Sequence, residues 1–467
     1  MRVSAAHGAL AAAALAHGPA LVLGHCGFDK VDLSTGPGFT ITVNDEYKVL
    51  EDTVAHVKYG LFCDDQPSGV DGIDKWFKVP VASVGVRLPA ASGFLEALGR
   101  RDLLTAAEVP ANLTNICLDA SKIKPLGDAG SNSTVADVVF SADAASDGDR
   151  SVRLPSDDAL TPLQRAEWIK FVAAFSNNEK QAAQLFDSVA AAYNCHWGNL
   201  QHLSKPPHAY WVQYSSDGGK PTYNIIDAAY QTSLLAGAGA TNSTRAALSD
   251  PSSQAQFQAA VKDADFVIDQ TALAQKGSRI SEWYRDFGYA DPQNSGVGFL
   301  RTRQIWRTDG YTSSSGVSNF PEFAYARPDL VLQDIIGVLE PTYAPDSKPR
   351  WMLWLGGTNE DTTVVAADNY DCAKPWMTSV AKCQPRTDFT GAPTAPSDNG
   401  SGSSKSPKRS HVGRIVGGIV GGLAAVALIV VGAHYCNKHR RLARVRALSQ
   451  AGYGGEGFVL RDARRFS

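Results

Sequence analysis

The feature that most constrains this chain is one long helical pattern between two stretches of short strand and helix candidates. Thr161 is a good helix N-cap and Pro162 a good first helical residue. Apolar side chains then recur mostly at steps of three or four, at Trp168, Phe171, Val172, Phe175, Ala182, Leu185, Phe186 and Val189. The spacing predicts a helix over residues 161–194, which is far longer than an average helix.

Strand and helix signals alternate on both sides of this helix. Before it, apolar runs at 81–86 and 136–140 read as strands and residues 90–98 as a helix. After it come strand candidates at 210–214, 266–268 and 351–355, and helical stretches at 223–236 and 333–339. Such alternation predicts the α/β class, with two lobes that have central sheets and are bridged by one long helix. Ligands of such proteins bind where strand ends face the crevice between lobes.

The two ends of the chain predict a membrane topology. Residues 1–24 carry one basic residue and an alanine-rich apolar run, as a secretory signal peptide does. Residues 415–433 contain no charge and are long enough to span a bilayer, within a predicted transmembrane helix at 413–434. Basic residues follow at once, which is typical of a cytoplasmic flank. The expected topology is single-pass type I at the plasma membrane or an endomembrane, with the body outside the cytosol.

These signals divide the chain into seven parts. We predict a signal peptide at 1–24, an N-terminal lobe at 25–160, the bridging helix at 161–194, a C-terminal lobe at 195–383, a disordered stalk at 384–412, the transmembrane helix at 413–434 and a cytoplasmic tail at 435–467. The stalk is rich in Pro, Ser, Gly and Thr, a composition that cannot bury a core.

Cysteines and glycosylation sequons fit this placement. Six of the seven cysteines lie in the body, so up to three disulfides are expected in an oxidising compartment. Spacing does not fix their pairing, although Cys372 and Cys383 are close enough in sequence to staple the end of the domain. Sequons mark four asparagines on the outer side: Asn112, Asn132, Asn242 and Asn399.

Composition and motifs exclude several function classes. Before residue 405 the chain holds 32 Lys and Arg against 45 Asp and Glu, an acidic body that argues against nucleic-acid binding. The zinc-protease, P-loop and hydrolase-elbow motifs are absent from the sequence, and no catalytic residue is assigned. We therefore predict a protein that is not an enzyme and uses no catalytic cofactor.

Several of these segments together resemble one family. They are residues 81–86 with 94–98, 136–140, the helix start at 162–171, 223–229 with 234–238, and 326–336. The chain from about 79 to 365 resembles the periplasmic substrate-binding proteins whose two lobes are bridged by one rigid helix. That group binds vitamin B12, ferric siderophores, haem and some metal ions. With a membrane anchor, the chain also resembles the surface-anchored cobalamin acquisition proteins of algae.

An aromatic set favours a large planar ligand such as a corrin ring. Aromatic rings bury large areas and, in Tyr and Trp, offer polar tips. Arg87 follows a predicted strand and could reach a ligand phosphate or carboxylate. The predicted ligand-binding residues are Arg87, Trp211, Tyr214, Tyr223, Trp283 and Tyr311. Strand alternation places Trp211 and Tyr214 on opposite faces, so core packing is the alternative for part of this set.

A metal-ion receptor is the sharper rival interpretation. Cys195 and His196 are adjacent, and His202 and His208 follow at steps of six. Imidazole is a good ligand for zinc or iron, but this spacing fits neither one helix face nor a zinc finger. No metal ligand is therefore predicted.

The sequence thus predicts a receptor that captures cobalamin outside the cell. Its partners would be the corrinoid, the membrane through one helix, and a translocation or endocytic partner that the sequence does not identify. Two alternatives stay open: a ferric-chelate, haem or metal-ion receptor, and an adhesion or signalling ectodomain that reuses the fold.

Overall fold

The computed structural model describes residues 28–130, 134–155, 159–217, 219–241, 253–272, 279–357, 363–364, 371–375 and 381–391. The predicted signal peptide, membrane span and cytoplasmic tail lie outside these ranges, as do Asn132, Asn242 and Asn399. None of the helices in the described ranges is both long and apolar enough to cross a membrane.

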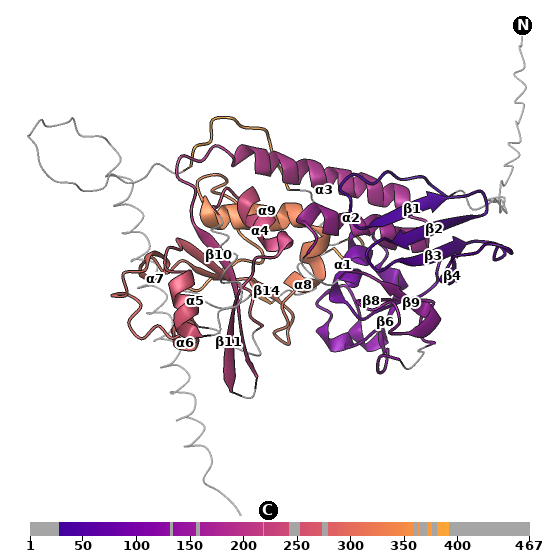
Figure 1. Cartoon of the computed structure of the whole chain (residues 1–467), viewed down its shortest axis with the longest axis horizontal. Coiled ribbons are helices and arrows are strands. Elements are labelled where there is room, and N and C mark those ends of the chain that lie inside the picture. Colours follow the sequence, from indigo (N-terminus) through magenta and orange to yellow (C-terminus); the bar gives the residue numbers. More distant parts are fainter. Residues whose placement is uncertain are drawn as a thin grey trace, which may run out of the picture. The chain divides into compact units, whose positions relative to one another are not determined.

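The N-terminal lobe contains two sheets (Figure 1). The first is a four-stranded sheet of β1 (Phe39–Val43), β2 (Tyr47–Asp52), β3 (Val57–Phe62) and β4 (Lys75–Lys78), in that order. The second is a parallel sheet in the order β7-β6-β5-β8-β9. Its strands are β5 (Val84–Val86), β6 (Leu104–Ala107), β7 (Lys124–Pro125), β8 (Val138–Ser141) and β9 (Ser151–Arg153). The first sheet was not predicted from the sequence.

The C-terminal lobe is built on a mixed sheet in the order β11-β10-β12-β13-β15. Its strands are β10 (Ala209–Asp217), β11 (Lys220–Ile225), β12 (Phe266–Asp269), β13 (Ile305–Arg307) and β15 (Leu353–Trp354). The central strands β10, β12 and β13 are parallel, and each edge strand is antiparallel to its neighbour. A short parallel pair, β14 (Tyr311–Thr312) and β16 (Thr363–Val364), lies apart from this sheet.

Helices separate and cover these sheets. They are α1 (Pro89–Ala97), α2 (Pro162–Ala173), α3 (Glu179–Asn199), α4 (Ala229–Gly237), α5 (Gln254–Ala260), α6 (Ile280–Asp286), α7 (Gly298–Arg301), α8 (Phe320–Phe323) and α9 (Pro328–Leu339). The mixed α/β organisation agrees with the predicted fold class. The stretch 223–236, predicted as one helix, instead starts in β11 and becomes helical only at Ala229.

The predicted bridge is two helices and not one. Thr161 caps α2 as expected, since its hydroxyl accepts from the backbone N–H of Gln164 and the Gln164 side chain accepts from the Thr161 backbone N–H. The helix then tightens into a 3₁₀ turn, Ala174–Ser176, and stops at Asn177, which has left-handed dihedrals of φ 52° and ψ 42°. Asparagine tolerates this conformation better than most residues, so the chain can restart as α3.

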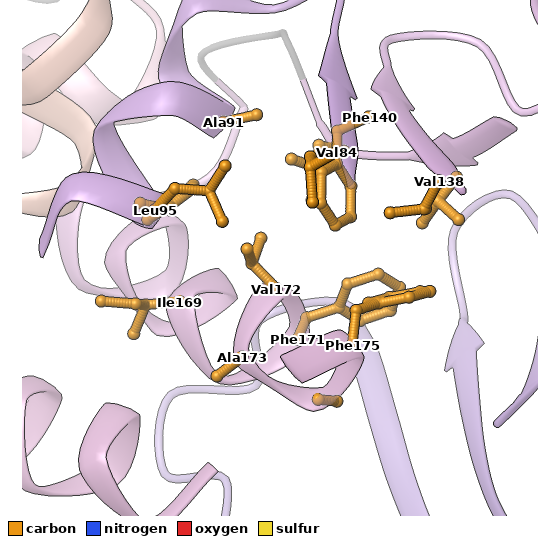
Figure 2. Close-up of a cluster of buried hydrophobic side chains, with 14 of the residues drawn as sticks. Val84, Ala91, Leu95, Val138, Phe140, Ile169, Phe171, Val172, Ala173 and Phe175 are labelled. Carbon is orange, nitrogen blue, oxygen red and sulfur yellow. The ribbon is translucent and has the colours of Figure 1, made fainter. Parts of the chain in front are cut away.

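The helix pair nevertheless connects the cores of both lobes. Phe171 near the end of α2 and Phe175 in the 3₁₀ turn that follows lie under the parallel sheet of the N-terminal lobe (Figure 2). The rings of Phe175 and Phe140 meet edge to face at 5.4 Å. In α3, Phe186 belongs to this same core, whereas Tyr193 belongs to the core of the C-terminal lobe. One helix therefore packs into both lobes, which fixes them to a common support.

Candidate functional site

The loops that follow the carboxyl ends of strands from both lobes touch each other. In the N-terminal lobe, α1 begins three residues after β5, and Thr114 follows β6 by seven residues. In the C-terminal lobe, the chain leaves β13 and passes through β14 into α8. The segments meet at Glu322 of α8, which accepts from the Ser92 hydroxyl at 2.5 Å and from the backbone N–H of Thr114 at 2.6 Å. We call this contact, formed by Ser92, Gly93, Thr114, Asn319 and Glu322, the lobe junction.

The junction is tightly packed as well as polar. A Cβ atom added to Gly93 would lie 1.8 Å from the carbonyl oxygen of Glu322, so only glycine lets α1 and α8 approach this closely. Thr114 also accepts from the Asn319 side-chain amide at 3.1 Å. Burial raises the pKa of Glu322 above its usual range, and the hydrogen bonds from Ser92 and Thr114 partly oppose this shift.

On the N-terminal side, Arg87 lies directly after β5 and is 5% exposed at its side chain. Its guanidinium pairs with Asp147 through two bonds of 2.7 and 2.6 Å, and it also donates to the carbonyl of Gly127 at 3.1 Å. The hydrogen bonds to Asp147 raise the pKa of Arg87. This bidentate pair ties the end of β5 to the loop after β8.

On the C-terminal side, a second polar cluster lies at the ends of β12 and β13. One oxygen of Asp269 accepts from the backbone N–H of Thr271 at 2.8 Å, and the other accepts from the Trp283 indole N–H at 3.1 Å. Arg307 donates from its Nε to Asp309 at 2.7 Å. The Oδ2 atom of Asp309 is buried and has no hydrogen-bond partner in the described part of the chain. An unsatisfied buried acceptor at a strand end is a candidate contact for a ligand donor.

The structure divides the six predicted ligand residues by burial. Trp211 is 0% exposed, Trp283 is 2% exposed and Tyr223 is 4% exposed, so all three lie in hydrophobic cores. Tyr214 and Tyr311 are half-buried. Arg87 lies at the strand ends of one lobe, and Trp283 and Tyr311 lie near those of the other. A ligand role for the six stays a prediction, and the half-buried tyrosines are the members that offer accessible surface.

Sequence reasoning missed the junction residues and the C-terminal cluster. Ser92, Asn319, Glu322, Asp269 and Asp309 are common polar residues without a local motif, and only tertiary contact groups them. One signal that sequence reasoning could have used is that Asp269 directly follows a predicted apolar strand. Polar residues at the carboxyl ends of strands face ligand crevices in α/β folds.

The cysteines form long-range bridges. Cys117 pairs with Cys372, and Cys195 pairs with Cys383, so the closeness of Cys372 and Cys383 in sequence does not make them a bonded pair. Cys63 is also disulfide-bonded. The sequence could not supply this pairing because the partners are 255 and 188 residues apart. The first bridge links the loop after β6 in the N-terminal lobe to the segment at 371–375.

The residues of the rival metal cluster have other contacts. Cys195 is in a disulfide, and the Nδ1 atom of buried His196 lies 3.0 Å from the Tyr343 hydroxyl. Burial lowers the pKa of His196. His208 lies 3.2 Å from the Thr241 hydroxyl. In the ranges that the structure describes, no group of three or more His, Cys, Asp or Glu side chains is placed to hold a metal ion.

Comparison with known proteins gives a likeness in structure alone. No family model matches the chain, and no curated protein sequence matches it. Similar solved structures include a periplasmic binding protein from Veillonella parvula (14% identity, TM-score 0.44, covering 58% of this chain and 88% of that one). They also include the periplasmic heme-binding protein HutB of Vibrio cholerae (16%, 0.43, 55% and 98%) and the vitamin B12-binding protein BtuF of Vibrio cholerae (13%, 0.36, 57% and 99%). All three are binding proteins. Because the TM-scores lie below 0.5, this likeness assigns no ligand to this chain.

Proposed function

We propose that this chain is an extracytoplasmic binding protein that captures cobalamin for uptake. The observation that carries the proposal is the lobe junction, where loops from the carboxyl ends of β5 and β6 meet the chain that leaves β13. Open α/β sheets bind ligands beyond the carboxyl ends of their strands. A ligand held beside this junction would contact both lobes at once.

The chemistry beside the junction suits a large ligand rimmed with amides. Carboxylates and hydroxyls lie at the strand ends of both lobes, and Asp309 has a buried oxygen with no partner in the described ranges. Corrin side-chain amides can donate to such acceptors, whereas haem brings carboxylates that like-charged side chains would repel. The half-buried rings of Tyr214 and Tyr311 would pack on the macrocycle.

The proposed setting follows the predicted topology. The body would lie outside the cell or in an endomembrane lumen, anchored by one helix at 413–434. The three sequons outside the described ranges and Asn112, whose side chain is exposed, would carry glycans. Glycosidase treatment should then shift the gel mobility of the full-length protein, and an unshifted band would contradict the topology.

Equilibrium binding tests the ligand. The full-length protein in detergent is equilibrated with cobalamin, freed of unbound ligand by gel filtration, and scanned for corrin absorbance; parallel samples receive haem or a ferric siderophore. We expect corrin absorbance to travel with the protein at close to one equivalent. If the protein retains haem or the siderophore but not cobalamin, the alternative of a haem or ferric-chelate receptor would replace the cobalamin proposal. Retention of none of the three would overturn the binding proposal.

A further inference from the structure

A cavity lies at the opposite end of the N-terminal parallel sheet from the lobe junction. It has a volume of about 510 Å³, and the residues that line it include Trp76, Lys78, Ala82, Asp137, Asp149 and Arg150. Ala82, Asp137 and Arg150 come just before β5, β8 and β9, so the cavity lies at the amino ends of these strands. The lobe junction belongs to their carboxyl ends, so the two sites are separate.

Hydrogen bonds between distant segments hold the walls of this cavity in place. The ammonium group of Lys75, on β4, donates to the carbonyls of Gly148 at 2.6 Å and Ser151 at 2.9 Å, which fixes the turn that carries Asp149 and Arg150. The Asp137 carboxylate accepts from the backbone N–H groups of Ala82 and Ser83, both at 2.9 Å. The wall is therefore preformed and needs little ordering when a ligand binds.

The free charges on this wall are of both signs. Within the described residues, the side chains of Lys78 and Asp149 make no hydrogen bond or ion pair, and both residues are exposed. The charge of Asp149 partly opposes the lowering of the Lys75 pKa by burial. Arg150 uses Nη1 to donate to the carbonyl of Ala136 at 2.7 Å, which leaves its other donors for the cavity. Asp137, which is also exposed, accepts from backbone donors through Oδ2 alone. The wall thus offers two cationic groups and two carboxylates, of which Asp149 has neither oxygen engaged by a donor in the described ranges.

An aromatic side chain completes the wall. The Trp76 ring packs edge-on against Tyr47 at 5.6 Å and Phe62 at 6.2 Å. A Cβ on Gly60 would lie 2.3 Å from the Trp76 ring, so the absence of a side chain there makes room for the indole. Trp76 is half-buried and is one of the residues that line the cavity.

We propose that this cavity binds a free aromatic α-amino acid. Its carboxylate would pair with Arg150 and Lys78, its ammonium with Asp149, and its ring would lie on Trp76. The volume lies within the usual range for small-molecule sites of about 300–1,000 Å³. A wall with charges of both signs favours a zwitterion over a ligand that is only anionic or only cationic.

Calorimetric titration of the full-length protein with L-phenylalanine tests this site. We expect saturable binding that becomes about fivefold weaker or more in Lys78→Ala and in Asp149→Asn, because each removes one charge contact. Lys348→Ala and Asp346→Asn are matched controls, since both residues are exposed in the C-terminal lobe and make no ion pair in the described ranges. Neither control should change the affinity. All four variants should keep the parent melting temperature.

Two altered probes separate the charge contacts. N-acetyl-L-phenylalanine lacks the ammonium and L-phenylalaninamide lacks the carboxylate, so each should bind at least about fivefold more weakly than phenylalanine. Equal binding of either probe would overturn the zwitterion assignment. Absence of binding by phenylalanine, or unchanged affinity in both cavity variants, would overturn the site itself. These outcomes are independent of cobalamin binding at the junction.

Discussion

The buried carboxylate of Glu322 is the main hydrogen-bond acceptor of the lobe junction. It is 1% exposed and holds Ser92 and Thr114 of the opposite lobe through three hydrogen bonds. Removing the carboxylate would leave the buried N–H of Thr114 without a partner, which typically costs about 1–3 kcal/mol. The same burial makes the ionised form expensive, so this contact is sensitive to pH.

The first prediction concerns that pH dependence. Burial raises the pKa of Glu322 above its ordinary value of 4.5, so its stabilising contribution is fully present below pH 4.5 and is lost as pH rises through the folded pKa. Glutamine cannot titrate, and it can still accept from Thr114 and donate to the Ser92 hydroxyl. The melting temperature of Glu322→Gln relative to the parent should therefore rise with pH, by about 2 °C or more between pH 4.5 and 7.5. A difference that is constant across this range would contradict the prediction.

Trp211 and Tyr311 separate core packing from ligand contact. Trp211 is fully buried and its ring lies 6.2 Å from that of Phe320, so Trp211→Ala should cost about 3–5 kcal/mol of stability and lower secretion. Tyr311 is half-buried, so Tyr311→Ala should change melting far less and weaken cobalamin binding by about tenfold to hundredfold. Melting temperature and affinity are measured on both variants. Unchanged affinity in Tyr311→Ala would remove it from the proposed site.

The apolar periodicity of the sequence predicts on which face of a strand a side chain lies, but not how deeply that side chain is buried. Alternation places Trp211 and Tyr214 on opposite faces of one strand, and the structure assigns them to two different hydrophobic cores. Alternation cannot predict the layer of helices that covers the Trp211 face, because that layer combines α3 and α4 with α8 and α9, which come more than 100 residues later. The site is therefore less predictable from sequence than the strand that carries part of it.

At the scale of elements, the break between α2 and α3 is the main departure from expectation. The apolar period continues across it, since Phe171, Phe175 and Phe186 all enter one core. The helix nevertheless stops at Asn177, because this residue adopts left-handed dihedrals. The side-chain oxygen of Asn177 accepts from the buried ammonium of Lys48 at 3.0 Å. Lys48 also pairs with Glu179 in the first turn of α3, and desolvation lowers the pKa of Lys48. Through Lys48, the four-stranded sheet thus holds the first turn of α3 in place.

A pair of substitutions at Asn177 tests this interpretation. Asn177→Gly and Asn177→Ala both remove the amide that binds Lys48, but only alanine has to pay the steric cost of a positive φ. Asn177→Ala should therefore be less stable than Asn177→Gly by about 1–2 kcal/mol in denaturant unfolding. The glycine variant is the control for the lost hydrogen bond. Equal stability would contradict a steric cost at a positive φ, and an alanine variant more stable by about 1 kcal/mol would mean that the chain passes this point as a continuous helix.

At the scale of the whole described body, one disulfide and one shared helix pair limit lobe movement. Cys117–Cys372 joins the loop after β6 to a segment near the end of the described chain, and Arg101 donates to the carbonyl of Lys374 at 3.2 Å in the same place. Cys195–Cys383 instead joins the last part of α3 to a segment beside the C-terminal core. A ligand should therefore change the structure only slightly compared with binding proteins that close by hinge bending.

The two bridges provide a matched comparison. Their loops of 255 and 188 residues predict nearly equal entropic stabilisation, about 5 kcal/mol each, because the loop term grows only with the logarithm of length. The double variants Cys117→Ser/Cys372→Ser and Cys195→Ser/Cys383→Ser should thus lose similar amounts of unfolding free energy. Hydrogen exchange should distinguish them, because only the first bridge lies beside the lobe junction. We expect faster exchange in peptides that cover α1 and α8 in the first variant alone. Equal exchange in both variants would mean that the packing of Gly93 against Glu322 holds the lobes together without help from the bridge.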